Sequence, residues 1–168
     1  NINTNTGGGV GTRFDAMLTG TYRLNTRTSD DTATIVDRAL GSSSEEDRNN
    51  RRANLERRLR SPEMIAIDIR NQTVGMASSL QPQVTFQADG VARAETNPRG
   101  RTTTTTATVD ADGLIINYQG ERANDFYLTF MPMNDGRLRV TRKIYLDNQE
   151  ITVSSTYDKI DRTAQFAT

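Results

Sequence analysis

The strongest constraint on the fold is the long run of alternating apolar and polar residues that follows Pro62. Such alternation is typical of strands with one buried face. Three Asp-Gly pairs, at 89–90, 112–113 and 135–136, fall between alternating runs. An Asp-Gly pair in that setting is the strongest short-range signal for a hairpin. We therefore predict an antiparallel meander after Pro62, without a helix longer than two turns.

The strands of this meander follow from the alternation alone. They are expected at about 64–70, 74–78, 83–88, 91–95, 101–109, 113–119, 124–131, 137–146, 151–158 and 163–167. The later strands are expected to bury Val84, Phe86, Leu114, Ile116, Tyr118, Phe126, Leu128, Phe130, Leu138, Val140, Ile144, Leu146, Ile151, Val153 and Tyr157. This many sequential strands are buried most economically in a barrel, closed or nearly closed, or in a two-sheet sandwich.

The segment before Pro62 combines a strand with helices. Alternation over 17–24 predicts a first strand, and the apolar period then changes to that of a helix. Acidic residues at 30–31 can cap a short helix that ends at Gly41. Ser43 and Glu46 stand at capping-box spacing for a second helix, which Pro62 stops. We predict a two-helix insertion at about 31–61 in a mainly β domain spanning 13–168.

The first twelve residues differ from the rest of the chain because they carry no charge. Ile2, Thr4 and Thr6 alternate with asparagines, and Gly7, Gly8 and Gly9 follow as a flexible hinge. This pattern predicts an arm, residues 1–12, that adds as a strand to a sheet edge of another copy. Head-to-tail contacts of that kind build filaments when they do not close. The main functional hypothesis is therefore a non-catalytic, self-assembling structural subunit whose partners are copies of itself.

Composition excludes several classes of function. The chain of 168 residues has no His and no Cys, which removes Cys nucleophiles, Ser-His-Asp triads and the usual zinc sites. Its 21 basic residues balance 21 acidic ones, whereas nucleic-acid binders are normally basic. No apolar run approaches the length of a membrane span. We predict no catalytic residue, metal, cofactor or nucleic-acid partner; an enzyme using only carboxylates, Tyr and Arg is a third hypothesis.

Arg142 is a charged residue at a position where the alternation predicts an apolar one. It stands between Val140 and Ile144 on the predicted inward face. Tyr22, inward on the first strand, can offer its ring to the guanidinium, a contact worth about 0.5–2 kcal/mol. Alternatively, the Arg142 stem packs while its head reaches water at the barrel mouth.

A Gly-x-Tyr at 20–22 combined with a late-strand arginine resembles the lipocalin and calycin barrels, in which a late arginine covers the aromatic residue of a Gly-x-Trp on the first strand. That resemblance implies an alternative function, a barrel that binds a small lipophilic ligand.

A second resemblance covers more of the chain and concerns exported bacterial β-rich proteins of unknown function. It is carried by Gly20-Thr21-Tyr22-Arg23-Leu24, Ser29-Asp30-Asp31, Arg58-Leu59-Arg60-Ser61-Pro62-Glu63-Met64, Val84-Thr85-Phe86-Gln87-Ala88-Asp89-Gly90, Asn124-Asp125-Phe126 and Arg139-Val140-Thr141-Arg142. The resemblance implies export to the periplasm or outside the cell. The start without Met and the absence of Cys are compatible with a mature exported chain.

Overall fold

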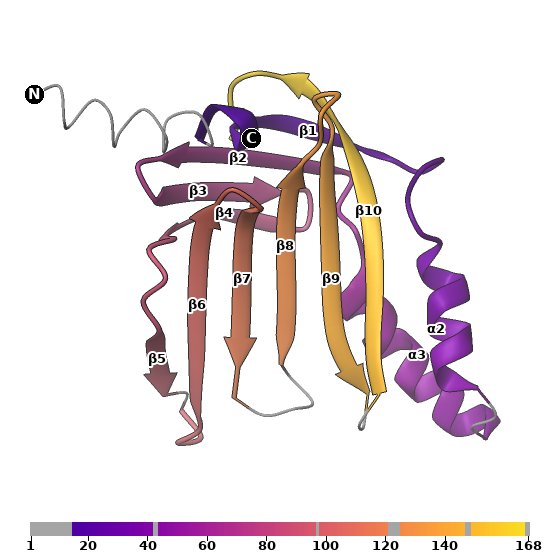
Figure 1. Cartoon of the computed structure of the whole chain (residues 1–168). Coiled ribbons are helices and arrows are strands. Elements are labelled where there is room, and N and C mark those ends of the chain that lie inside the picture. Colours follow the sequence, from indigo (N-terminus) through magenta and orange to yellow (C-terminus); the bar gives the residue numbers. More distant parts are fainter. Residues whose placement is uncertain (1–14, 42–43, 97, 121–124, 147–148, 167–168) are drawn as a thin grey trace, which may run out of the picture.

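Ten strands form one antiparallel sheet, and two helices follow the first strand (Figure 1). The computed structural model describes residues 15–41, 44–96, 98–120, 125–146 and 149–166. The elements are β1 (Gly20–Asn25), α2 (Thr32–Leu40), α3 (Glu45–Leu59), β2 (Met64–Arg70), β3 (Thr73–Ser78), β4 (Gln81–Gln87), β5 (Arg93–Thr96), β6 (Thr102–Asp110), β7 (Gly113–Gln119), β8 (Phe126–Pro132), β9 (Leu138–Leu146) and β10 (Gln149–Asp161). The predicted mainly β class and the helical insertion are confirmed.

The sheet is curled into a half-barrel. Its strand order is β4-β3-β2-β1-β10-β9-β8-β7-β6-β5, so the first and last strands are paired and every neighbouring pair is antiparallel. Strands β2, β3 and β4 run across the upper ends of strands β6 to β9 (Figure 1). Because β4 and β5 are the two ends of the order, the curl stays open between them.

One of the three predicted Asp-Gly hairpins does not form. The turns at 112–113 and 135–136 connect paired strands, but Asp89-Gly90 lies between β4 and β5, which are not paired with each other. Instead, the Gly90 N–H donates to the Ala107 carbonyl (2.7 Å) and Asp89 forms an isolated bridge with Thr108. The chain does change direction at Asp89-Gly90, as predicted, but there it contacts β6 instead of forming a hairpin.

The predicted last strand, 163–167, is also corrected. Strand β10 continues to Asp161, and the described residues beyond it form no strand. The Thr21 hydroxyl donates to the Thr163 carbonyl (2.8 Å) and accepts from the Gln165 N–H (2.8 Å). The Thr21 hydroxyl thus satisfies the Thr163 carbonyl and the Gln165 N–H, two backbone groups that would otherwise need a partner from a further strand.

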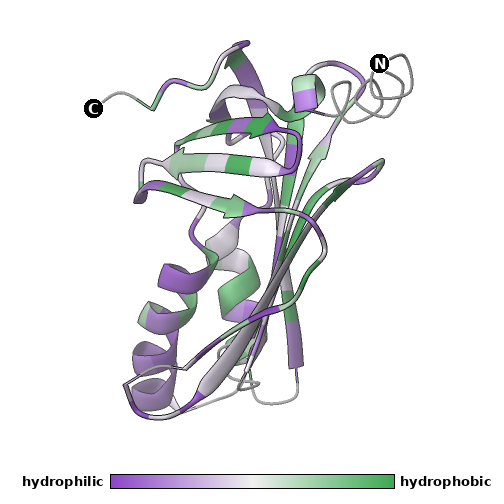
Figure 2. Cartoon of the chain, turned by 90° about the vertical axis from the view of Figure 1, so that its left-hand side faces the viewer, coloured by the Kyte–Doolittle hydropathy of each residue, from purple (hydrophilic) through white to green (hydrophobic). Residues whose placement is uncertain are grey.

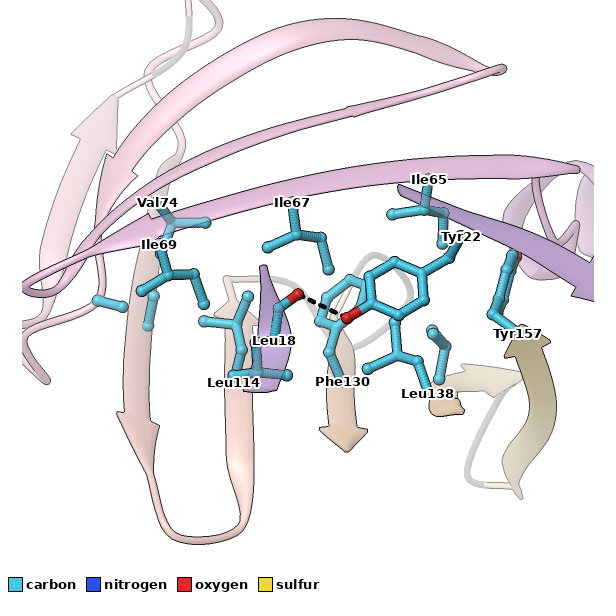
Figure 3. Packing of buried hydrophobic residues seen from close by; sticks show 13 residues of the cluster. Leu18, Tyr22, Ile65, Ile67, Ile69, Val74, Leu114, Phe130, Leu138 and Tyr157 are labelled. Atoms are coloured by element: carbon cyan, nitrogen blue, oxygen red, sulfur yellow. Dashed lines mark hydrogen bonds between the residues drawn. The ribbon is translucent and has the colours of Figure 1, made fainter. Parts of the chain in front are cut away.

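The upper half of the curl is filled by a first cluster of buried apolar residues, which we call the upper cluster (Figure 3). Its members are Leu18, Tyr22, Ile65, Ile67, Ile69, Val74, Ala88, Ala107, Leu114, Phe130, Leu138, Val140 and Tyr157. Most come from β1, β2 and β3 on one side and from β6 to β10 on the other, and Leu18 and Ala88 lie just outside strands. The Tyr22 hydroxyl donates to the Leu18 carbonyl (2.7 Å), so this buried phenol is satisfied.

The two helices lie against the lower parts of β9 and β10 on the same concave face (Figure 2), forming a second cluster that we call the lower cluster. Its members are Val36, Leu40, Leu55, Leu59, Ile144, Ile151 and Val153. Asp31 caps α2, as predicted. Ser44, rather than the predicted Ser43, caps α3 by accepting from the Asp47 N–H. Both helices turn polar faces outward, as the hydropathy colouring shows.

Candidate functional site

A large cavity lies between the helices and the curled sheet. Its volume is about 1370 Å³, above the 300–1,000 Å³ usual for small-molecule sites. The α3–β2 connection, the turn after β3 and the inner faces of β8, β9 and β10 all contribute to its wall. Apolar side chains from four strands or turns line it, namely Leu24, Leu80, Phe126, Leu128 and Ile144. The cavity is therefore large enough for a small ligand, and its wall combines these apolar side chains with polar and charged ones.

Arg142 enters this cavity at the level where the two apolar clusters meet. Two residues flank Arg142 on the inner face of β9. Val140 belongs to the upper cluster, and Ile144 belongs to the lower cluster. Burial lowers the pKa of the Arg142 guanidinium, and Tyr157 partly offsets that effect. An arginine nevertheless stays protonated in a protein. Its Nε is buried without a hydrogen-bond partner among the described residues, so one donor of a charged group that lines the cavity is unsatisfied.

A layer of hydroxyl groups accompanies Arg142. The Tyr157 side chain interacts with the guanidinium, and its own hydroxyl donates to the Pro62 carbonyl (2.7 Å). Burial raises the pKa of Tyr157 to about 12, so the phenol is neutral at physiological pH. Beside it, the hydroxyls of Ser155 and Ser61 are hydrogen-bonded at 2.6 Å. The alternation placed Tyr157 inward, but it carried no signal that Tyr157 and Ser155 would share a polar layer with Arg142.

The structure does not bring Tyr22 and Arg142 together. Tyr22 is opposite Lys159 on β10, whereas Arg142 is opposite Val153 on the other side of that strand. Lys159 and Val153 are six residues apart, which corresponds to about 20 Å at about 3.3 Å per residue. The predicted cation–π pair is therefore wrong, although alternation correctly turned both side chains toward the interior.

Lys159 takes the place predicted for the arginine over the Tyr22 ring. Its Nζ lies 5.5 Å from the ring centroid and donates to the Met17 carbonyl at 3.2 Å. Gly20 permits this approach, because a Cβ there would stand 3.1 Å from the lysine side chain and closer still to the Asp161 carbonyl oxygen. The contact joins β10 to β1, which are neighbours in the sheet, and it lies far from Arg142.

The remaining predicted site residues are those of the N-terminal arm. The arm residues Ile2, Thr4, Thr6, Gly7, Gly8 and Gly9 lie outside the described residues. Across the described part of the chain, no group of three or more acidic residues is placed to hold a metal ion. No helix within it is long and apolar enough to cross a membrane.

Sequence comparison shows no family for this chain. No protein-family model matches it, and comparison with curated protein sequences gives no match either. Structural comparison does give matches at low sequence identity.

A protein described as REP1-NXSQ fatty acid transporter matches with a TM-score of 0.53 at 20% identity, over 87% of this chain and 98% of the other. A tyrosine-to-phenylalanine mutant of that transporter gives 0.52 at 19% identity, over 86% and 99%. Lipid binding protein 8 of Caenorhabditis elegans gives 0.50 at 17% identity, over 85% of this chain and 95% of the other.

These matches correct the main functional prediction. The hypothesis of a filament subunit assembled through an N-terminal arm is contradicted, because the solved structures reported above that share this architecture are named a fatty acid transporter and a lipid binding protein. The resemblance to calycin barrels is supported at the level of the fold, whereas export stays a prediction. The described chain is a ten-stranded antiparallel half-barrel with helices inserted after its first strand, the fold of these lipid-binding proteins.

Proposed function

We propose that this protein is a non-catalytic binding protein for a small lipophilic ligand with an anionic head group. The head group is held at Arg142, and the apolar part occupies the cavity between the helices and the sheet. The observation that carries the proposal is the buried, unpartnered Nε of Arg142 at the boundary between two apolar clusters. We further propose that the protein acts after export.

A buried guanidinium without a counter-charge is unfavourable, because its desolvation is not offset by an ion pair. In the described residues no carboxylate lies within ion-pair distance of Arg142. A ligand carboxylate would supply the missing charge, and its two oxygens match the planar donor fork of arginine. The neighbouring Tyr157 hydroxyl adds a polar group on the same side.

The apolar part of the ligand would cover surface that the protein leaves open. Leu80 is 44% exposed although it lines the cavity, and Leu24, Phe126 and Leu128 beside it are only partly buried. Covering apolar surface stabilises a complex by roughly 25 cal/mol per Å². The names of two matching structures, a fatty acid transporter and a lipid binding protein, support this class of ligand.

The test is calorimetric titration of the delipidated protein with dodecanoate. We expect saturable binding at one site. Arg142→Gln should weaken it by about 10- to 100-fold, since a hydrogen bond to a charged group contributes about 1.5–3 kcal/mol.

Arg139→Gln is the matched control for this titration. Arg139 is exposed on the same strand, so its substitution should leave the affinity unchanged. Absence of dodecanoate binding, or equal affinities for the wild type and Arg142→Gln, would contradict the proposal.

A further inference from the structure

A second guanidinium lines the same cavity. Arg58 extends from α3 and is half-buried, and its Nη2 lies 3.5 Å from the Asp125 carbonyl oxygen at the start of β8. Burial and the neighbouring charge of Arg57 lower the pKa of Arg58. Arg57 and Arg60 also contribute to the cavity wall, but both are exposed to solvent. Among Arg57, Arg58 and Arg60, which all line the cavity, Arg58 is thus the one that is partly withdrawn from water.

The acidic residues of the cavity are engaged elsewhere. Asp30 accepts a hydrogen bond from the Ser154 N–H (2.8 Å), and Asp31 caps the first turn of α2. Glu56 faces Arg52 at 3.8 Å, one turn away on its own helix. Among the described residues, neither cavity guanidinium has a carboxylate within ion-pair distance. Arg142 and Arg58 are therefore not ion-paired, although the cavity wall also carries the carboxylates of Asp30, Asp31 and Glu56.

An apolar segment separates the two cations. Arg142 is opposite Leu128 on β8, and Arg58 donates to the carbonyl of Asp125, which lies three residues earlier in the chain and directly precedes that strand. Three strand residues span about 10 Å. Phe126 lies between these levels, and its ring stacks on Tyr118 with centroids 5.0 Å apart and planes 8° apart. The wall thus alternates from cation to aromatic surface to cation.

We propose, building on the function proposed above, that the ligand is an amphiphile with two anionic groups joined by an apolar segment. One group is held at Arg142 and the other at Arg58. An ordinary monocarboxylate neutralises only the inner cation, whereas an α,ω-dicarboxylate neutralises both. The second charge costs desolvation wherever no cation receives it, so the position of Arg58 determines whether such a ligand is preferred or rejected.

The experiment compares octanedioate, dodecanedioate and hexadecanedioate with their monocarboxylates by calorimetric titration at low ionic strength. We expect at least one dicarboxylate to bind about 10-fold more tightly than the monocarboxylate of equal length, as a charged hydrogen bond would give. Arg58→Gln should abolish that advantage and leave the affinity for the monocarboxylate within about twofold. Arg38→Gln, an exposed α2 control outside this cavity, should change neither affinity.

The outcomes separate the two proposals. If monocarboxylates bind but every dicarboxylate binds more weakly, or if Arg58→Gln weakens both ligand types equally, the dianionic ligand is overturned and the proposed function stands. If neither ligand type binds, both proposals fail. Far-ultraviolet circular dichroism of Arg58→Gln checks that α3 is intact, so that a lost advantage reports on the removed charge.

Discussion

Arg142 illustrates how one side chain can serve binding at the expense of stability. Its neighbours along the inner face of β9, Val140 and Ile144, are almost completely buried, and each belongs to a different apolar cluster. A packed apolar residue at 142 would join the two clusters. The arginine instead holds a charge in the interior, and this is favourable only when an anion arrives.

We therefore predict that Arg142→Met raises the free energy of unfolding of the ligand-free protein by about 1–3 kcal/mol while it removes anionic ligand binding. Methionine fills a similar space and needs no hydrogen bond. Urea denaturation of the delipidated protein measures the change. Arg139→Met, on the solvent side of β9, should alter stability by less than about 0.5 kcal/mol. A destabilisation of more than about 1 kcal/mol by Arg142→Met would show that Arg142 is a structural residue.

At the scale of elements, the β6–β7 and β8–β9 hairpins differ in how much they depend on glycine. Gly113 and Gly136 both follow Asp and both have positive φ, +114° and +85°. A Cβ at Gly113 would overlap the Phe130 carbonyl oxygen on β8, whereas a Cβ at Gly136 meets no atom within 4 Å. The turn at Gly113 is in close contact with β8, whereas the turn at Gly136 leaves room for a side chain.

Alanine substitutions at these two turns should therefore differ. Gly136→Ala is expected to destabilise the protein by about 1–2 kcal/mol, the cost of a left-handed backbone for a residue with a Cβ. Gly113→Ala should cost more than about 3 kcal/mol, because β7 must also move away from β8. Thermal and urea denaturation give both values. Equal destabilisation by the two substitutions would contradict the close approach at Gly113.

At the scale of the whole molecule, the curl creates a cavity because its two halves are closed by different elements. Strands β2 and β3 cover the upper cluster, and α2 and α3 cover the lower cluster on β9 and β10. The α3–β2 connection crosses between them, held by the Tyr157 bond to the Pro62 carbonyl and by the Ser61 bond to Ser155. The polar layer and the cavity both lie along this crossing.

Alternation was sufficient to predict most of the strands and most of their inward-facing residues, but Val84, which was also assigned inward, is 47% exposed. Leu114, Phe130 and Val153, all assigned inward from period alone, are buried. Turn chemistry is equally local, so Asp89-Gly90 could be recognised as a turn. Whether the strands on either side pair depends on the distant contact with Ala107 and Thr108, which no local pattern reports.

The site was harder to predict than the fold. Arg142 stood out because a charge interrupts an apolar face, but its partner depended on the register of β10, which separates it from Tyr22 by about 20 Å. Arg58 gave no signal, because α3 carries many arginines and only packing shows which one enters the cavity.

The central claim, that the ligand's anionic group binds Arg142 inside the cavity, is tested most directly by nuclear magnetic resonance of the arginine side-chain Nε–H groups. The Arg142 signal is identified by its loss in Arg142→Gln. Because this Nε–H has no partner in the ligand-free protein, we predict that dodecanoate moves its proton resonance downfield as the carboxylate accepts the hydrogen bond, while the signal of Arg139 stays in place. Saturable dodecanoate binding with an unchanged Arg142 signal would contradict the claim.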